Sequence, residues 1–376
     1  MVGVIKRFDW ILLGCLVPLF VWSLLTLKAT ETSLANDYFF TRQLIWIAVG
    51  FLLMVCVSYL DWHVFSHSGV ILVIYAVVML LLIGLFVTGR EIKGAISWFT
   101  FPVASFQPAE IAKVALILVL AKYFSRRHID IARFRHLVIS GIYTFVPVAL
   151  ILLQPDLGSA IIIVAVWMGI TMVAGIRLHH FLIITAAGVG VAVAGWFFFL
   201  QPYQQQRILT FVNPGSDPMG TGYNALQSMI AVGSGEFFGK GVGYGSQSRL
   251  RFLPESETDF IFAAFAEEWG FAGVVLLFIV VGILLWRILA IGFASPSNFT
   301  RLFSVGFSLL LVVQIIIHAG MNMGLLPITG ITFPFLSYGG SNLLTLFFGI
   351  GILQNVHFHR YLGHAADVAG IGDSLD

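Results

Sequence analysis

Long apolar runs alternate with short polar segments along the whole chain. The hydrocarbon core of a bilayer is about 30 Å thick, so a helix that crosses it needs roughly 20 mostly apolar residues. Ten runs approach this length, near residues 9–28, 43–60, 69–88, 108–125, 137–153, 159–175, 180–200, 260–285, 302–323 and 341–357. A backbone inside a bilayer must satisfy its own hydrogen bonds, so each run is predicted to be a helix. The pattern predicts an all-α, polytopic integral membrane protein with about ten transmembrane helices.

The composition supports this fold class. Hydrophobic residues make up 59% of the 376 residues and charged residues only 10%, whereas soluble domains carry roughly 25% charged residues. The net charge of +2 provides no basic surface, so we expect membrane lipids, and no nucleic acid, among the partners. The chain has no internal repeat and no Pro/Ser-rich linker, and a single domain over residues 1–376 is therefore expected.

Basic residues indicate the orientation of the chain. An even number of helices puts both termini on one side of the membrane, and cytoplasmic segments are enriched in Lys and Arg. With both termini cytoplasmic, the inner basic residues are Lys6, Arg7, Arg126, Arg127, Arg133, Arg135, Arg177, Arg287, Arg301 and Arg360, and the outer ones are Lys28, Arg42, Arg90 and Lys93. This asymmetry predicts a multi-pass protein of the cytoplasmic (inner) membrane. Its longest loop, about residues 201–258 between helices 7 and 8, is then extracytoplasmic.

The outer loop is predicted to fold back onto the helices. Nine glycines between Gly215 and Gly245 exclude one long helix, and the segment is too apolar for a free linker. Apolar residues recur within 224–232, which predicts a short interfacial helix there. Residues 327–342, rich in Pro and Gly, are predicted to form a re-entrant loop that lines the same mouth.

Ionisable residues within apolar runs need a reason, because a charge at the centre of a membrane helix costs about 2.5–3.5 kcal/mol on insertion scales. Glu110 and Lys113 lie three positions apart and project from one helix face. They form either a structural ion pair or part of a polar cavity open to the outer surface. Asp156 follows a helix-breaking proline, where a cap and a ligand role explain it equally well. Glu267 and Glu268 stay unassigned, since they either pair with a neighbouring helix or line the cavity.

Three carboxylates, Glu255, Glu257 and Asp259, lie within five residues just before the eighth run. Helix initiation needs one capping oxygen, and a Ser or Thr can supply it, so this acidic run exceeds what capping requires. Close like charges raise one another's pKa. The run therefore predicts a general base or a site for a divalent cation, Mg²⁺ or Mn²⁺.

Arginines lie on the same predicted outer side, at Arg207, Arg249 and Arg251. Guanidinium groups suit phosphate oxygens, although contact with lipid headgroups explains any one of them as well. A transporter more often buries its polar groups near the membrane midplane. The one-sided layout instead indicates chemistry on, or binding of, an amphiphile in the outer leaflet.

Five segments together resemble the SEDS proteins of shape, elongation, division and sporulation. They are GAISWF at 94–99, FQPAEIAK at 106–113, QPDLGSA at 154–160, GYGSQSRLRFLPESETDFIFA at 243–263 and PFLSYGGSN at 334–342. GSQSRL, QPDLG and TDFIFA are closest to the rod-shape (RodA) branch. The resemblance implies a peptidoglycan glycosyltransferase that polymerises lipid II into glycan strands outside the cytoplasmic membrane during cell elongation. It also implies a complex with a class B penicillin-binding protein, which is a transpeptidase.

The resemblance implies site residues as well. The aspartate of TDFIFA, held essential for polymerisation in the family, falls on Asp259. The cavity-lining glutamate and lysine of QPAEIAK fall on Glu110 and Lys113, and the aspartate of QPDLG falls on Asp156. We therefore assign Asp259 as catalytic. The residues assigned to substrate binding are Glu110, Lys113, Asp156, Arg207, Ser256 and Ser341.

The chemistry of joining two sugars fits these residues. A proton must leave the acceptor hydroxyl as it attacks an anomeric carbon, and Asp259 can take it. The pyrophosphate leaving group is a weak base, so cationic side chains or a divalent cation suffice to stabilise it. Many family members carry a basic pair where this chain has Ile96 and Ser97, although Lys93 lies nearby. Two alternatives stay open: a flippase or transporter of the same lipid, and a non-catalytic scaffold of the cell-wall synthesis complex.

Overall fold

The computed structural model describes residues 8–31, 38–60, 64–65, 67–92, 95–100, 105–126, 134–198, 200, 202–213, 215, 217 and 220–368. Within these residues, ten helices have 18 residues or more. They are α2 (Trp10–Thr30), α3 (Tyr38–Ser58), α5 (Ser68–Thr88), α6 (Pro108–Ser125), α7 (Phe134–Leu153), α8 (Leu157–Ala174), α9 (Leu178–Phe198), α13 (Ile261–Ala294), α14 (Asn298–Asn322) and α15 (Gly340–Val368). Each predicted apolar run coincides with one of these helices, and α13 and α15 extend well beyond the predicted ends.

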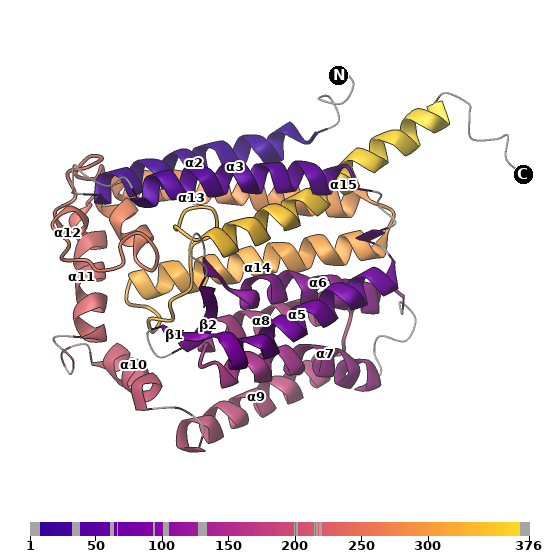
Figure 1. Ribbon diagram of the computed structural model, residues 1–376, viewed down its shortest axis with the longest axis horizontal. Helices are drawn as coiled ribbons and strands as arrows, with labels where there is room; N and C mark the ends of the chain where they lie inside the picture. The colour runs from indigo at the N-terminus through magenta and orange to yellow at the C-terminus, as the bar shows by residue number, and fades with distance from the viewer. Residues whose placement is uncertain are drawn as a thin grey trace, which may run out of the picture.

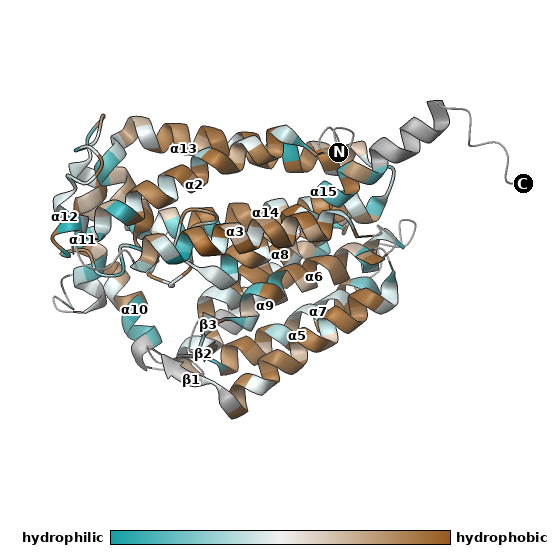
Figure 2. Ribbon diagram, turned by 45° about the horizontal axis from the view of Figure 1, so that its top comes forward, coloured by the Kyte–Doolittle hydropathy of each residue, from teal (hydrophilic) through white to brown (hydrophobic). Residues whose placement is uncertain are grey.

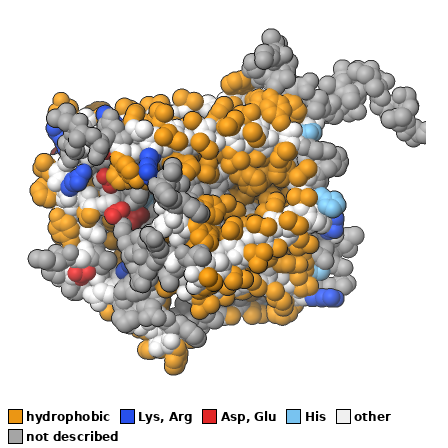
Figure 3. All heavy atoms as spheres, in the orientation of Figure 1, with side chains coloured by type: hydrophobic (Ala, Val, Ile, Leu, Met, Phe, Trp, Pro, Cys, Tyr) orange, Lys and Arg blue, Asp and Glu red, His pale blue; other side chains and the backbone are white. Residues whose placement is uncertain are grey.

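The long helices lie side by side along one direction (Figure 1). Apolar residues dominate their length (Figure 2), and charged side chains gather at the two ends of the bundle (Figure 3). This distribution is the one that a bilayer imposes on a bundle that crosses it.

Eight of the described helices are long and apolar enough to cross a membrane by themselves, and α6 and α15 are more polar. α6 packs against α5, α7, α8, α14 and α15, and 14 of its 18 residues are buried. A helix enclosed by protein presents few side chains to lipid. α6 can therefore carry Glu110 and Lys113 without exposing charge to hydrocarbon.

Shorter elements cover one end of the bundle. They are the helices α10 (Pro202–Val212), α11 (Thr221–Ser234) and α12 (Ser246–Arg249) and the antiparallel strands β1 (Arg90–Ile92), β2 (Ala95–Thr100) and β3 (Ser105–Phe106). Figure 1 shows the three helices at the end away from the C-terminus. α11 confirms the predicted short helix, whereas α10, α12 and the strands were not predicted.

α13 is interrupted at Gly270, whose φ of 65° and ψ of −168° lie outside the helical region. Such a conformation strongly favours glycine. The neighbouring loop forms hydrogen bonds with the backbone groups that the interruption leaves unpaired within the helix. The N–H groups of Lys240 and Gly241 donate to the carbonyls of Glu267 and Glu268, respectively. The N–H groups of Phe271 and Ala272 donate to the carbonyls of Glu236 and Phe237, respectively. A Cβ at Gly239 would lie 2.1 Å from the Glu268 carbonyl oxygen. Glycine at position 239 therefore lets the loop approach α13 closely enough to form hydrogen bonds with the backbone groups around the interruption.

Candidate active site

The acidic run forms a turn whose backbone is held from three directions. The carbonyl oxygens of Glu257, Thr258 and Asp259 each accept a hydrogen bond from a separate residue. In that order, the donors are the Tyr338 N–H (2.9 Å), the Ser337 hydroxyl (2.9 Å) and the Asn322 side-chain amide (3.0 Å). Three successive peptide groups are thus fixed, which defines the directions in which the acidic side chains leave the turn.

Asp259 is half-buried and lies directly before Phe260, the N-cap residue of α13. Gly330 passes beside its carboxylate with a φ of +71°, and a Cβ at Gly330 would lie 3.8 Å from Oδ2 of Asp259. The side chain that glycine lacks leaves room beside this carboxylate. Asp259 therefore combines a backbone fixed by hydrogen bonds with a carboxylate beside which a glycine passes.

Glu110 and Lys113 form a buried ion pair, with Nζ of Lys113 2.7 Å from Oε1 of Glu110. The other carboxylate oxygen accepts a 2.7 Å hydrogen bond from Nδ2 of Asn342. All three side chains are buried. A buried carboxylate that is paired and hydrogen-bonded on both oxygens is held in one orientation. The structure establishes the ion pair, which was the first of the two alternatives.

A second network adjoins this pair. The N–H of Gln107 donates to Oγ of Ser341 (3.0 Å), and the Ser341 hydroxyl donates to the carbonyl of Ser105 (3.2 Å). The Gln107 side chain donates to Oδ2 of Asp156 at 3.1 Å. Oδ1 of Asp156 accepts from the N–H of Ser159 at 3.0 Å and so caps α8. Asp156 is thus both a helix cap and a member of a polar network.

One segment joins the acidic turn to these networks: residues 327–342, which we call the strap. Ser337 and Tyr338 hold the acidic turn, whereas Ser341 and Asn342 hold the first turn of α6. The strap also crosses the start of α8, where a Cβ at Gly158 would lie 3.0 Å from the Thr329 carbonyl oxygen. The structure therefore brings Asp259, Glu110, Lys113, Asp156 and Ser341 to the same end of the bundle.

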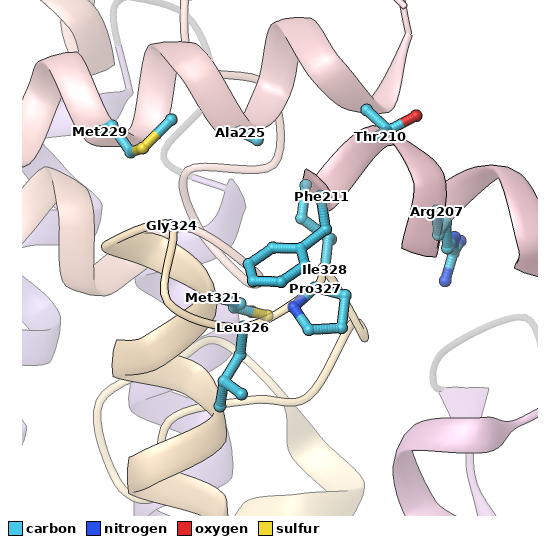
Figure 4. A pocket seen from close by; sticks show the side chains of 10 residues that line it. All are labelled: Arg207, Thr210, Phe211, Ala225, Met229, Met321, Gly324, Leu326, Pro327 and Ile328. Atoms are coloured by element: carbon cyan, nitrogen blue, oxygen red, sulfur yellow. The ribbon is translucent and has the colours of Figure 1, made fainter. Parts of the chain in front are cut away.

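Arg207 lies on α10 and lines a small, partly open hollow of about 30 Å³. The hollow is lined by Arg207, Thr210, Phe211, Ala225, Met229, Met321, Gly324, Leu326, Pro327 and Ile328. Figure 4 shows Phe211, Leu326 and Pro327 near its middle and Arg207 to one side. An apolar hollow with one cationic side chain at its edge suits an amphiphile with an anionic head.

The remaining polar residues of the turn differ in exposure. Ser256 is buried, whereas Glu255, Arg249 and Arg251 are exposed. Burial is the main cause that raises the pKa of Glu257, the charge of Glu255 adds to the rise, and the charge of Arg251 opposes it. The three carboxylates of the run are therefore not equivalent, and Arg249 and Arg251 are available to lipid headgroups as well as to substrate.

Two other expectations concern anions and metals. Ser97 is buried and donates to the carbonyl of Gln154 at 3.4 Å, while Lys93 lies outside the described residues. In the part of the chain that the structure describes, no three His, Cys, Asp or Glu side chains form a group that could hold a metal ion. Mg²⁺ that accompanies phosphates typically uses only one or two carboxylates.

Glu267, which the sequence left unassigned, is fully buried and anchors the glycine-rich loop. Its carboxylate accepts hydrogen bonds from Nζ of Lys240, Oγ of Ser246, N–H of Gln247, and both N–H and Oγ of Ser248. Glu268 accepts one from the N–H of Gly243 at 3.0 Å. Both glutamates therefore bind the glycine-rich loop, Glu267 in part through the short helix α12, whereas the sequence had offered a neighbouring helix or the cavity wall.

The fold and the motifs match a known family. Its model, described as "Cell cycle protein" and named for FtsW, RodA and SpoVE, matches residues 5–362. This chain belongs to that family. Peptidoglycan glycosyltransferase MrdB of Escherichia coli K12 is 36% identical over 324 residues, which cover 85% of each chain. Stage V sporulation protein E of Bacillus subtilis 168 is 35% identical over 332 residues, which cover 87% of this chain and 89% of the relative.

Solved structures of the FtsW/RodA/SpoVE family share this fold. A chain from "Structural coordination of polymerization and crosslinking by a peptidoglycan synthase complex" is similar with a TM-score of 0.79 at 32% identity. The rod shape determining protein RodA of Thermus thermophilus is similar with a TM-score of 0.71 at 31% identity. Each comparison covers 94% of this chain and 98% of the other. The resemblance to SEDS proteins and the polytopic all-α fold are confirmed.

Sequence reasoning found the charged groups of this family member but missed the amides that orient them. Asn322, Asn342 and Gln107 each bind a predicted site residue or its backbone. A neutral amide does not stand out as a charge does in an apolar run. The signal that could have found them is their position, because each lies at a helix end beside a Pro- or Gly-rich segment.

Proposed function

We propose that this chain is a peptidoglycan glycosyltransferase that polymerises lipid II into glycan strands at the outer face of the cytoplasmic membrane during cell elongation. MrdB, 36% identical across 85% of both chains, is named for that enzyme activity. The observation that carries the proposal is the strap, which holds the turn of Asp259 and the Glu110–Lys113 pair at one end of the bundle. This supports the proposal, because the same segment contacts the turn of the proposed base and the carboxylate that pairs with the proposed cation.

Asp259 is the proposed general base. Its ionised carboxylate accepts the proton of the acceptor sugar hydroxyl as that oxygen forms a bond to the anomeric carbon of the donor. The bond between the anomeric carbon and the phosphate oxygen breaks, and its electron pair leaves with the lipid pyrophosphate. Because pyrophosphate is a weak base, the second carboxyl group that glycosidases use as an acid is unnecessary.

Lys113 and Arg207 are the proposed partners of the pyrophosphate. Glu110 and Asn342 hold the Lys113 ammonium group in place, and cationic groups fixed in advance stabilise charge that develops on a leaving group. The apolar hollow beside Arg207 suits the first part of the lipid chain. In the proposal, Asp156, Ser256 and Ser341 complete the substrate site around these groups.

The proposed setting is the inner membrane, with both termini cytoplasmic and membrane lipids around the bundle. The proposed partner is a class B penicillin-binding protein that cross-links the growing strands. Its support is a 32% identical chain that belongs to a peptidoglycan synthase complex. A cysteine at position 259 in place of Asp should react with a membrane-impermeant thiol reagent added outside intact cells. Reaction only after the membrane is permeabilised would overturn the orientation.

A divalent cation, Mg²⁺ or Mn²⁺, is also part of the proposal. The described residues do not assemble three metal ligands of their own, so one or two carboxylates and the phosphate oxygens of the substrate would hold the ion. Such an ion would add to the charge stabilisation of the leaving group.

Polymerisation of lipid II by the purified complex with its transpeptidase partner tests the function. Wild-type protein should produce glycan chains on a gel, whereas Asp259→Ala should produce none. Glu236→Gln serves as the matched control, because this carboxylate lies in the loop that packs on α13 and outside the proposed substrate site. Polymer from Asp259→Ala would remove the base assignment. Lack of polymer from the wild-type complex would favour the flippase or the scaffold, and transport of lipid II across vesicles would then separate those two.

A further inference from the structure

The first turn of α13 is capped by a side chain from another helix. Phe260, the N-cap residue directly before the helix, makes no side-chain capping bond. The N–H of Ala263 donates instead to Oδ1 of Asn322 at 3.1 Å. A capping side chain normally bonds the second or third N–H of the helix that it precedes, and Ala263 is the third residue of α13. Asn322, the last residue of α14, performs this role from outside.

The same amide fixes the peptide group that follows Asp259. Nδ2 of Asn322 donates to the Asp259 carbonyl (3.0 Å) and to the His318 carbonyl (2.8 Å), and Oδ1 also lies 3.4 Å from the hydroxyl of Ser228. Both donors of the amide and two of its acceptor positions are thus in use. The Asn322 side chain is fully buried. A buried amide with these hydrogen bonds has a single orientation. Its bond to the Asp259 carbonyl therefore fixes the backbone of Asp259 as well.

An aspartate at the start of a helix commonly turns its carboxylate onto the first N–H groups. A carboxylate in that position is stabilised as the anion by the helix dipole and is a weaker base. It also points toward the helix and away from a reacting hydroxyl. In this chain the cap of Ala263 comes from Asn322, so α13 does not require the Asp259 carboxylate for that hydrogen bond.

We propose that Asn322 is a positioning residue for the transfer reaction. By capping α13 and holding the Asp259 carbonyl, it directs the Asp259 carboxylate to the acceptor hydroxyl. This inference rests on the proposed function. Misplacement of a reacting group by about 1 Å can lower a rate about 100-fold, so a distortion too small to unfold the protein is enough to show the effect.

Three variants of the full chain in its complex separate positioning from folding. Asn322→Asp keeps the shape and the acceptor for Ala263 but loses both N–H donors. Asn322→Ala loses every side-chain bond. Ser228→Ala is the matched control, because it removes a bond to Asn322 and leaves the Asn322–Asp259 bond in place. Folded protein is counted as binding sites for fluorescent lipid II per chain, and kcat, KM and the pH profile of kcat/KM are measured for polymerisation.

We expect both Asn322 variants to lower kcat per binding site about tenfold or more, with KM changed less than about threefold. We also expect Asn322→Asp to move the low-pH limb of kcat/KM upward, because a carboxylate beside Asp259 raises the pKa of the base. Ser228→Ala should stay within about twofold of wild type. If kcat per chain falls only in proportion to the number of binding sites, kcat per binding site is unchanged and the proposal is overturned. A wild-type kcat in Asn322→Ala would also overturn it.

A readout without activity distinguishes this proposal from the proposed function. In a chain lacking Cys15 and Cys56, a cysteine replacing Asp259 is labelled with a charged thiol reagent, with and without Asn322→Ala. If Asn322 positions residue 259, its removal should change the labelling rate by at least about threefold, because the side-chain direction changes. An unchanged rate counts against the positioning role, whether or not the wild type polymerises lipid II. A changed rate with no wild-type polymer would retain the positioning and remove the glycosyltransferase.

Discussion

Nδ2 of Asn342 donates a 2.7 Å hydrogen bond to Oε2 of Glu110, from the same strap that holds the acidic turn. Lys113 occupies the other oxygen at 2.7 Å, so both oxygens of this buried carboxylate are bound. Lys113→Met should therefore destabilise the protein by about 3 kcal/mol, because it leaves a buried charge without its partner. The unfolding midpoint in detergent measures the change.

The double variant Glu110→Gln, Lys113→Met removes both charges and provides the control. It should recover a large part of the lost stability, since the cost lies in the unpaired charge and not in the absence of the pair. It should not recover polymerisation, because the proposed pyrophosphate site lacks its cation. A double variant as unstable as Lys113→Met alone would contradict this account.

The backbone at Gly270 has a φ of 65°, and a Cβ there would lie 2.2 Å from the nitrogen of Gly239. Gly270→Ala should lower the free energy of unfolding by more than about 2 kcal/mol, from backbone strain together with the clash. Gly282→Ala, later in the same helix, is the matched control because no atom lies within 4 Å of its added Cβ. It should be neutral or slightly stabilising. Equal thermal midpoints for the two variants would show that the helix is not broken as described.

Glu257 predicts a pH dependence of stability. Burial raises its pKa in the folded protein above the ordinary value of 4.5, so folding favours the protonated form. Its contribution to stability is complete below pH 4.5 and is lost as the pH rises through the folded pKa. Glu257→Gln should therefore flatten this part of the stability profile and exceed wild type at neutral pH. Thermal midpoints from about pH 4 to about pH 8 test it, and a profile that Glu257→Gln leaves unchanged would refute it.

Chelation should separate activity from stability. We expect EDTA to abolish polymerisation, and Mg²⁺ or Mn²⁺ to restore it, because the proposed cation binds together with the substrate phosphates. The thermal midpoint of the lipid-free protein should not change, since the ion would be bound largely through the substrate. Full activity in EDTA would exclude the cation, and a large loss of stability would indicate a resident structural metal.

The ten long helices could be predicted because bilayer thickness imposes one length and one composition on every crossing. The acidic run and the Glu110–Lys113 pair could be found because charges are costly in apolar segments. The strands near Ser97 were missed, since segments this short carry too few residues for a hydrophobic period to appear. Helix α10 was missed because its polar run of three glutamines has the composition of a loop.

The connections within the site could not be read from the sequence. Asn322 and Asp259 are 63 positions apart, and Asn342 and Glu110 are 232 apart. Asn322 reaches Asp259 because α14 packs back along α13, and Asn342 reaches Glu110 because the strap folds back across the helix ends. No local pattern encodes either path. The two interpretations of Asp156 could not be separated for the same reason, because its second partner, Gln107, lies 49 positions away.

The interruption of α13 divides one continuous element into two parts with separate tasks. Residues 261–269 follow directly on the acidic turn and orient it, and residues 271–294 lie among the membrane helices. The loop of residues 236–241 forms hydrogen bonds on both sides of Gly270, so its conformation sets the angle between the two parts of α13. A substitution that changes the backbone conformation of this loop would therefore shift the acidic turn relative to the membrane helices, whereas Glu236→Gln, which keeps the backbone carbonyl of residue 236, would not.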